Sequence, residues 1–86
     1  MKVYVVTSLV ENRDIGAEVT IVGVKQSEKE AQELLQKLLK DVKLEYDTNE
    51  VEYEVHNFEK NIIAVESDGC GDYEYITLEY QEKEVE

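Results

Sequence analysis

The chain has 86 residues, the size of one domain with room for a single modest core. Its hydrophobic fraction of 42% excludes a disordered chain, and no apolar run approaches the ~20 residues needed to cross a bilayer. With one cysteine and no signal-peptide pattern, we expect a single soluble domain over residues 1–86, located in the cytoplasm.

The net charge of −12 is concentrated in the second half of the chain. Residues 1–43 hold seven acidic and seven basic side chains, whereas residues 44–86 hold fourteen acids against Lys60 and Lys83. Because like charges repel, we expect neither direct nucleic-acid binding nor binding to an anionic membrane. A basic protein partner is compatible with this charge. So is the simpler interpretation that acidity keeps a small domain soluble.

The first half of the chain predicts a β-hairpin followed by a helix. Residues 2–10 and 17–25 are rich in β-branched side chains and flank a polar turn, as in an antiparallel hairpin. Ser27 and Glu30 have the spacing of a helix-capping box. Apolar residues then recur on one helical face, at Ala31, Leu34, Leu35, Leu38, Leu39 and Val42. We expect this helix to end before a loop at residues 45–49.

The second half predicts three more strands. Val51, Tyr53 and Val55 alternate with polar residues, which is typical of a half-buried strand. Two further strands are expected at residues 62–66 and 73–81, with turns at 58–61 and 67–72 and a frayed acidic tail at 82–86. The predicted fold class is α+β, a mainly antiparallel sheet of about five strands with one helix, in the order β-β-α-β-β-β.

One helix is too narrow to cover such a sheet. Five strands at ~4.8 Å spacing span roughly 20–24 Å, whereas a helix is ~10–12 Å wide. The first strand is apolar on both faces, with Val3, Val5 and Leu9 on one and Tyr4, Val6 and Val10 on the other. Alternation in the second strand places Val19 and Ile21 on one face and Val22 and Val24 on the other. Either the sheet curls on itself or a second copy covers the bare face, and we expect a homodimer.

Catalytic motifs are absent from the sequence. Gly69 and Gly71 lack the third glycine of a dinucleotide-binding loop, and one histidine excludes a paired-histidine metal motif. A hairpin that turns near residues 59–60 places His56 opposite about Ile63. Cys70 then lies well over ~10 Å away, too far for a nucleophile pair.

The acidic residues do not predict a cation or substrate site either. Asp68, Asp72 and Glu74 lack the spacing of the helix-flanked calcium loop. Paired carboxylates are numerous, but the sequence indicates no substrate cleft. We therefore expect no catalytic residue, no cofactor and no metal.

Acidic residues and tyrosines alternate repeatedly in the second half of the chain. Glu50, Glu52 and Glu54 are expected to share one face of the third strand, with a carboxylate every ~7 Å. That spacing is within about twofold of the phosphate spacing along a DNA strand. Tyrosine is enriched at protein interfaces. The candidate partner-binding residues are Glu50, Glu52, Glu54, Asp72, Tyr73, Glu74 and Tyr75.

These observations favour a non-enzymatic acidic protein-binding module. Its most specific form is an inhibitor that mimics nucleic acid and occupies the basic groove of a nucleic-acid-binding protein. The alternative is a small domain whose main contact is its own homodimer, with acidity serving only solubility.

The run Ile21–Ala31, in which a strand leads into a capped helix, resembles small uncharacterised proteins of bacteria and their phages. The size and acidity of the chain are similar to those of phage-encoded inhibitors that mimic DNA, including anti-CRISPR and anti-restriction proteins. The resemblance implies a protein-binding inhibitor and assigns no role to an individual residue.

Overall fold

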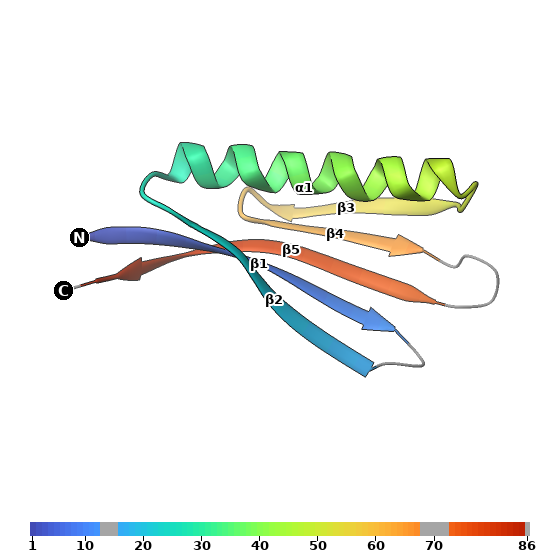
Figure 1. Ribbon diagram of the computed structural model, residues 1–86, viewed down its shortest axis with the longest axis horizontal. Coiled ribbons are helices and arrows are strands. Elements are labelled where there is room, and N and C mark those ends of the chain that lie inside the picture. Colours follow the sequence, from blue (N-terminus) through green and yellow to red (C-terminus); the bar gives the residue numbers. More distant parts are fainter. Residues whose placement is uncertain (13–15, 68–72, 86) are drawn as a thin grey trace.

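The computed structural model describes residues 1–12, 16–67 and 73–85. In Figure 1 a single helix lies against one face of a five-stranded sheet. The elements in chain order are β1 (Lys2–Asn12), β2 (Gly16–Lys25), α1 (Glu28–Thr48), β3 (Tyr53–Glu59), β4 (Ile62–Ser67) and β5 (Glu74–Glu84). The predicted α+β class and the order β-β-α-β-β-β are confirmed.

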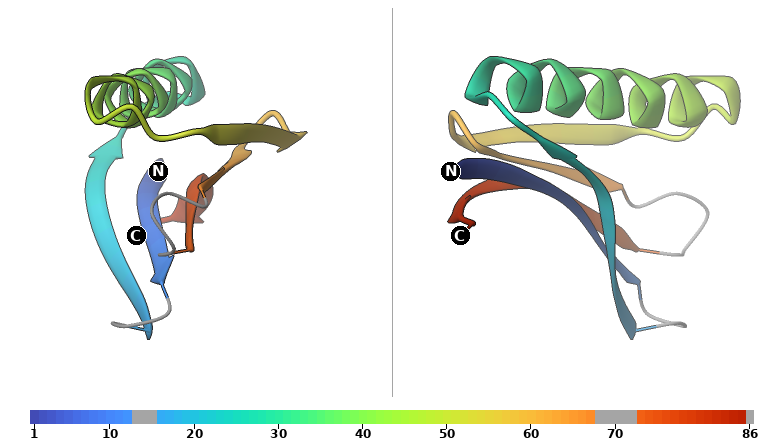
Figure 2. Two further views of the ribbon diagram at one scale, coloured as in Figure 1. Left: turned by 90° about the vertical axis from the view of Figure 1, so that its right-hand side faces the viewer. Right: turned by 60° about the vertical axis from the view of Figure 1, so that its left-hand side comes forward.

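The sheet is antiparallel, with the spatial order β2-β1-β5-β4-β3. The last strand, β5, pairs with β1 and β4 and so joins the two hairpins. The helix connects the edge strands β2 and β3, so the chain has to cross the whole width of the sheet within α1. Figure 2 shows a strongly twisted sheet, in which β2 runs down and away from the helix whereas β3 lies alongside it.

The helix begins as predicted but ends later. Ser27 Oγ accepts a hydrogen bond from the backbone N–H of Glu30 at 3.2 Å, which satisfies one of the free N–H groups of the first turn. The loop expected at residues 45–49 is wrong, because α1 continues to Thr48. Tyr46 lies one turn after Val42 and is buried, so it extends the apolar stripe that stabilises the helix.

The core lies between α1 and the facing sides of β1, β4 and β5. The helix contributes Ala31, Leu35, Leu39 and Tyr46, which are all buried. The strands contribute Val6, Ile63, Val65, Ile76, Leu78 and Tyr80. Gly23 allows the helix to pass close to β2, because a Cβ atom there would lie 3.1 Å from Leu34 Cδ2.

A β-bulge in the first hairpin gathers apolar side chains on the face that the helix does not cover. The pairing shifts between Val6 and Thr7, so that Ile21 lies opposite Thr7 while Val24 lies opposite Val5. The prediction that Ile21 and Val24 point to different faces is therefore wrong, since the bulge resets the alternation. We call this surface the hairpin face; it consists of Val5, Leu9, Val19, Ile21 and Val24. Val19, Ile21 and Val24 are 65%, 66% and 57% exposed.

The acidic end of the chain is ordered as far as the structure describes it. The prediction of a frayed tail at 82–86 is wrong for residues 82–84, which belong to β5 and pair with residues 2–4 of β1. The backbone N–H of Val85 also donates to the Met1 carbonyl oxygen at 2.7 Å. The length of β1 explains the difference, because its first residues supply backbone partners for the end of β5.

Candidate functional site

An acidic groove lies where the end of α1 meets the start of β3. It has a volume of about 760 Å³ and is lined by Asp47, Val51, Glu52, Tyr53, Glu54, Glu66 and Tyr73. Four of these residues are acidic, and none of the described lining residues is basic. The groove therefore concentrates negative charge on an open surface that also presents two tyrosine rings.

The tyrosines of the groove are held by neighbouring side chains. The ring of Tyr53 stacks on the buried ring of Tyr46, with centroids 5.6 Å apart. Tyr73 Oη donates a hydrogen bond to Glu66 Oε2, and this bond is the main reason why the pKa of Tyr73 is raised to about 12. These contacts restrict both rings before any partner binds.

Tyr46 makes the stability of the fold sensitive to alkali. Burial raises the pKa of Tyr46, and the hydrogen bond from its hydroxyl to Glu74 raises this pKa further. A group with a raised pKa stabilises the fold fully below its unfolded-state pKa of about 10, and this stabilisation is lost as the pH rises through the folded-state pKa.

We therefore expect the urea midpoint of the protein to fall between pH 8 and pH 11, and to fall less in Tyr46→Phe. Urea titrations of both proteins at the two pH values measure this difference. An equal fall in the two proteins would show that Tyr46 does not couple folding to pH.

Beside the groove, one histidine and two carboxylates converge on the face of the sheet away from the helix. Glu54 in β3 lies directly opposite Glu66 in β4. His56 Nε2 is 3.9 Å from Glu54 Oε2 and 3.6 Å from Glu66 Oε1. Imidazole nitrogen and carboxylate oxygen are both metal ligands, so these three side chains can hold a cation.

The predicted position of His56 is wrong by one residue. His56 lies opposite Ala64 rather than Ile63, because the chain turns at Lys60 and Asn61, one residue later than expected, and β3 carries an irregularity between Asn57 and Glu59. A shift of one residue changes the face on which neighbours meet, and it brings His56 beside Glu66.

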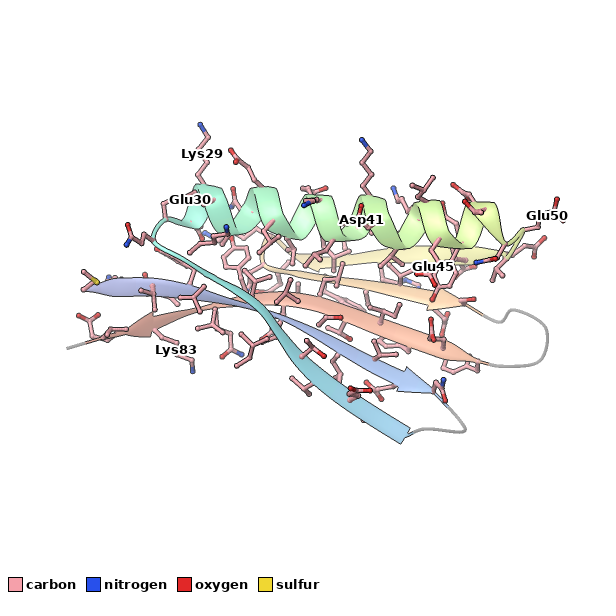
Figure 3. The ribbon with its side chains drawn as sticks, viewed as in Figure 1. Lys29, Glu30, Asp41, Glu45, Glu50 and Lys83 are labelled. Carbon is pink, nitrogen blue, oxygen red and sulfur yellow. The ribbon has the colours of Figure 1, made fainter. Side chains whose placement is uncertain are left out.

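The predicted partner-binding residues do not form one row. β3 begins at Tyr53, so Glu50 and Glu52 precede the strand and the expected face of three carboxylates does not exist. Glu50 has a φ of 57° and occupies the left-handed position that ends α1, and Figure 3 shows it at the extreme end of the helix. Glu52 and Glu54 both line the acidic groove.

The remaining predicted partner-binding residues have different surroundings. Tyr73 lies in the groove, whereas Glu74 accepts the hydrogen bond of Tyr46 and so supports the core. Tyr75 lines a separate hollow near Glu11 at the end of the first hairpin. Asp72 lies outside the described residues, as do Asp68, Gly69, Cys70 and Gly71.

Sequence reasoning missed Asp47, His56 and Glu66 as members of this site. The sequence predicts a loop at Asp47, which instead belongs to the last turn of α1. The register that pairs Glu54 with Glu66 results from the turn at Lys60 and Asn61 together with the irregularity in β3. That register was the missing signal.

The fold and the groove define a small acidic α+β domain with an open, tyrosine-containing anionic surface. The chain belongs to the family described as a domain of unknown function, DUF7336, which matches residues 1–84. Neither a curated protein nor a solved structure matches the sequence. In the described part of the chain, no helix combines the length and the apolar character needed to cross a membrane.

Proposed function

We propose that this protein is a non-enzymatic binding module whose acidic groove receives a lysine- or arginine-rich surface of a protein partner. The observation that carries the proposal is the groove itself, in which four carboxylates and two tyrosines meet without a basic lining residue among those described. The first 25 residues hold three acids and three bases, so the excess negative charge lies in the rest of the chain.

The composition of the groove suits recognition of cationic side chains. Carboxylates form charge-assisted hydrogen bonds with guanidinium and ammonium groups. The faces of tyrosine rings attract the same cations. Because Glu52 and Glu54 are exposed, they act at long range and speed the encounter with a basic partner more than they slow its release.

The most specific version of the proposal is a partner that itself binds nucleic acid, with the acidic surface occupying the basic groove of that partner. Its support is the sign and the concentration of the charge. A competition assay tests this version, because the protein should then displace nucleic acid from the partner.

Binding to a cationic probe should be strongly salt-dependent and should require the groove. With a labelled arginine-rich peptide as the probe, we expect the double variant Glu52→Gln/Glu54→Gln to weaken binding roughly three- to tenfold at low salt, since each exposed charge contributes about 0.2–1 kcal/mol. The measurement is fluorescence anisotropy at low and at high salt, with a chelator present throughout.

The matched control removes two exposed acids from the helix, Glu33→Gln/Asp41→Asn. This control should bind nearly as well as the wild type. Equal weakening by both double variants would show that the peptide responds only to net charge, and would contradict a site at the groove. A pull-down from a lysate at low and at high salt then identifies natural partners.

A second candidate function is self-association through the hairpin face. Its specific observation is the exposure of Val19, Ile21 and Val24 beside Val5 and Leu9, on a sheet face that no described helix or strand covers. A second copy is the occupant that the charges favour. Residues 1–25 are neutral overall, whereas contact through the remainder of the chain would bring together two strongly negative surfaces.

A further inference from the structure

We propose that Glu54, His56 and Glu66 form a binding site for a divalent transition-metal ion, with zinc as the representative ion. This inference does not depend on the proposed function. The expectation of no metal rested on the absence of paired histidines, and a site with one histidine and two carboxylates does not need them.

The geometry of the cluster is close to that of a metal site. Four ligand atoms about 2.1 Å from a tetrahedral zinc ion are about 3.4 Å apart. His56 Nε2 lies 3.6 Å from one carboxylate and 3.9 Å from the other, and the three ligand atoms are all within 4.8 Å of one another. Closing the site requires the Glu54 and Glu66 oxygens to approach by about 1.4 Å at most. Glu54 is able to move, because its side chain is 76% exposed.

The sheet places two like charges where a cation would stabilise them. Glu54 and Glu66 are direct cross-strand neighbours, and like charges in that arrangement destabilise a sheet. Among residues 1–12, 16–67 and 73–85, His56 is the basic side chain within ion-pair distance of these two carboxylates. A bound cation between the two carboxylates would relieve this repulsion.

Contacts around the cluster orient two of its three ligands. Glu66 Oε2 accepts the hydrogen bond of Tyr73, which leaves Oε1 directed at His56. The His56 ring stacks on Phe58, with centroids 6.0 Å apart and planes inclined by 20°. Outer contacts of this kind commonly fix ligands in metal sites. The half-exposed position of His56 and Glu66 leaves room for water or a partner's ligand to complete the coordination.

Calorimetric titration of the chelator-treated full chain with Zn²⁺ alone tests the site. We expect one saturable binding event per chain, and at least about tenfold weaker binding in His56→Gln and in Glu66→Gln. Because the chain has one histidine, the ring signals of His56 in an NMR spectrum report directly on coordination. They should shift on zinc addition and return when chelator is added.

Two control variants separate this site from other ways of holding zinc. Glu52→Gln removes a nearby carboxylate that is not a proposed ligand. Cys70→Ser removes the cysteine, a residue type that commonly binds zinc. Both should bind within about twofold of the wild type. Three results would each overturn the proposal. They are equal weakening of zinc binding by His56→Gln and Glu52→Gln, loss of zinc binding in Cys70→Ser, and His56 ring signals that do not shift when zinc is added. Circular dichroism of each variant verifies that it is folded.

Discussion

Leu35→Ala is expected to cost about 3 kcal/mol of unfolding free energy, within the range of 2–5 kcal/mol for leucine truncation in a core. Leu35 is 1% exposed and lies at the centre of the interface between α1 and the sheet. A domain of 86 residues has a total stability of roughly 4–13 kcal/mol. The substitution therefore removes a large share of the stability, because the single helix α1 packs over most of the core.

The same helix provides the matched control. Leu44 is 63% exposed, so Leu44→Ala should change the unfolding free energy by less than about 0.5 kcal/mol. Urea titrations of both variants at the same protein concentration measure the difference, because any contribution of association is then the same for variants that leave the hairpin face unchanged. A loss below about 1 kcal/mol in Leu35→Ala would mean that α1 contributes little to the core, contrary to the packing described above.

Ile21→Lys is expected to convert a dimer into a folded monomer. The wild-type chain of 10.0 kDa should appear at about 20 kDa in sedimentation or light scattering at micromolar concentration, as a dimer. Lysine at this position would place an ammonium group in the centre of the hairpin face, where a second copy would exclude water from it. Because Ile21 is 66% exposed within one chain, the substitution should leave the fold of the monomer intact.

Leu44→Lys is the control, since it makes the same change of charge at a leucine of similar exposure on the helix. This variant should remain a dimer. A wild-type mass of about 10 kDa would contradict self-association at the concentration used. Dissociation by both variants would instead place the contact on more than the hairpin face.

The local signals in the sequence identified most of the helices and strands. The errors lie where contacts between residues far apart in the sequence determine where an element ends or how strands pair. The helix start at Ser27 follows from a cap within one turn, and it is confirmed at the predicted residue. The predicted end of the helix was wrong, because the observed end depends on burial of Tyr46 against the sheet. In the same way, the end of β5 depends on pairing with the first residues of β1, which are distant in the sequence.

The candidate site depended on strand register more than on residue type. The sequence pattern identified the acidic and tyrosine-rich character of the second half, and Glu52, Glu54 and Tyr73 do line the groove. It did not place His56 beside Glu66, because the position of the turn and a one-residue irregularity in β3 together determine which side chains meet.

The α+β class, the order of the elements, the helix cap and the uneven charge can all be predicted from the sequence, because short-range periodicity and composition encode these properties. The folded structure was needed to establish the strand order, the two β-irregularities and the convergence of acids at the end of α1. These features depend on pairing between residues far apart in the chain. A shift of one position in such a pairing exchanges the buried and exposed faces, and composition does not record it.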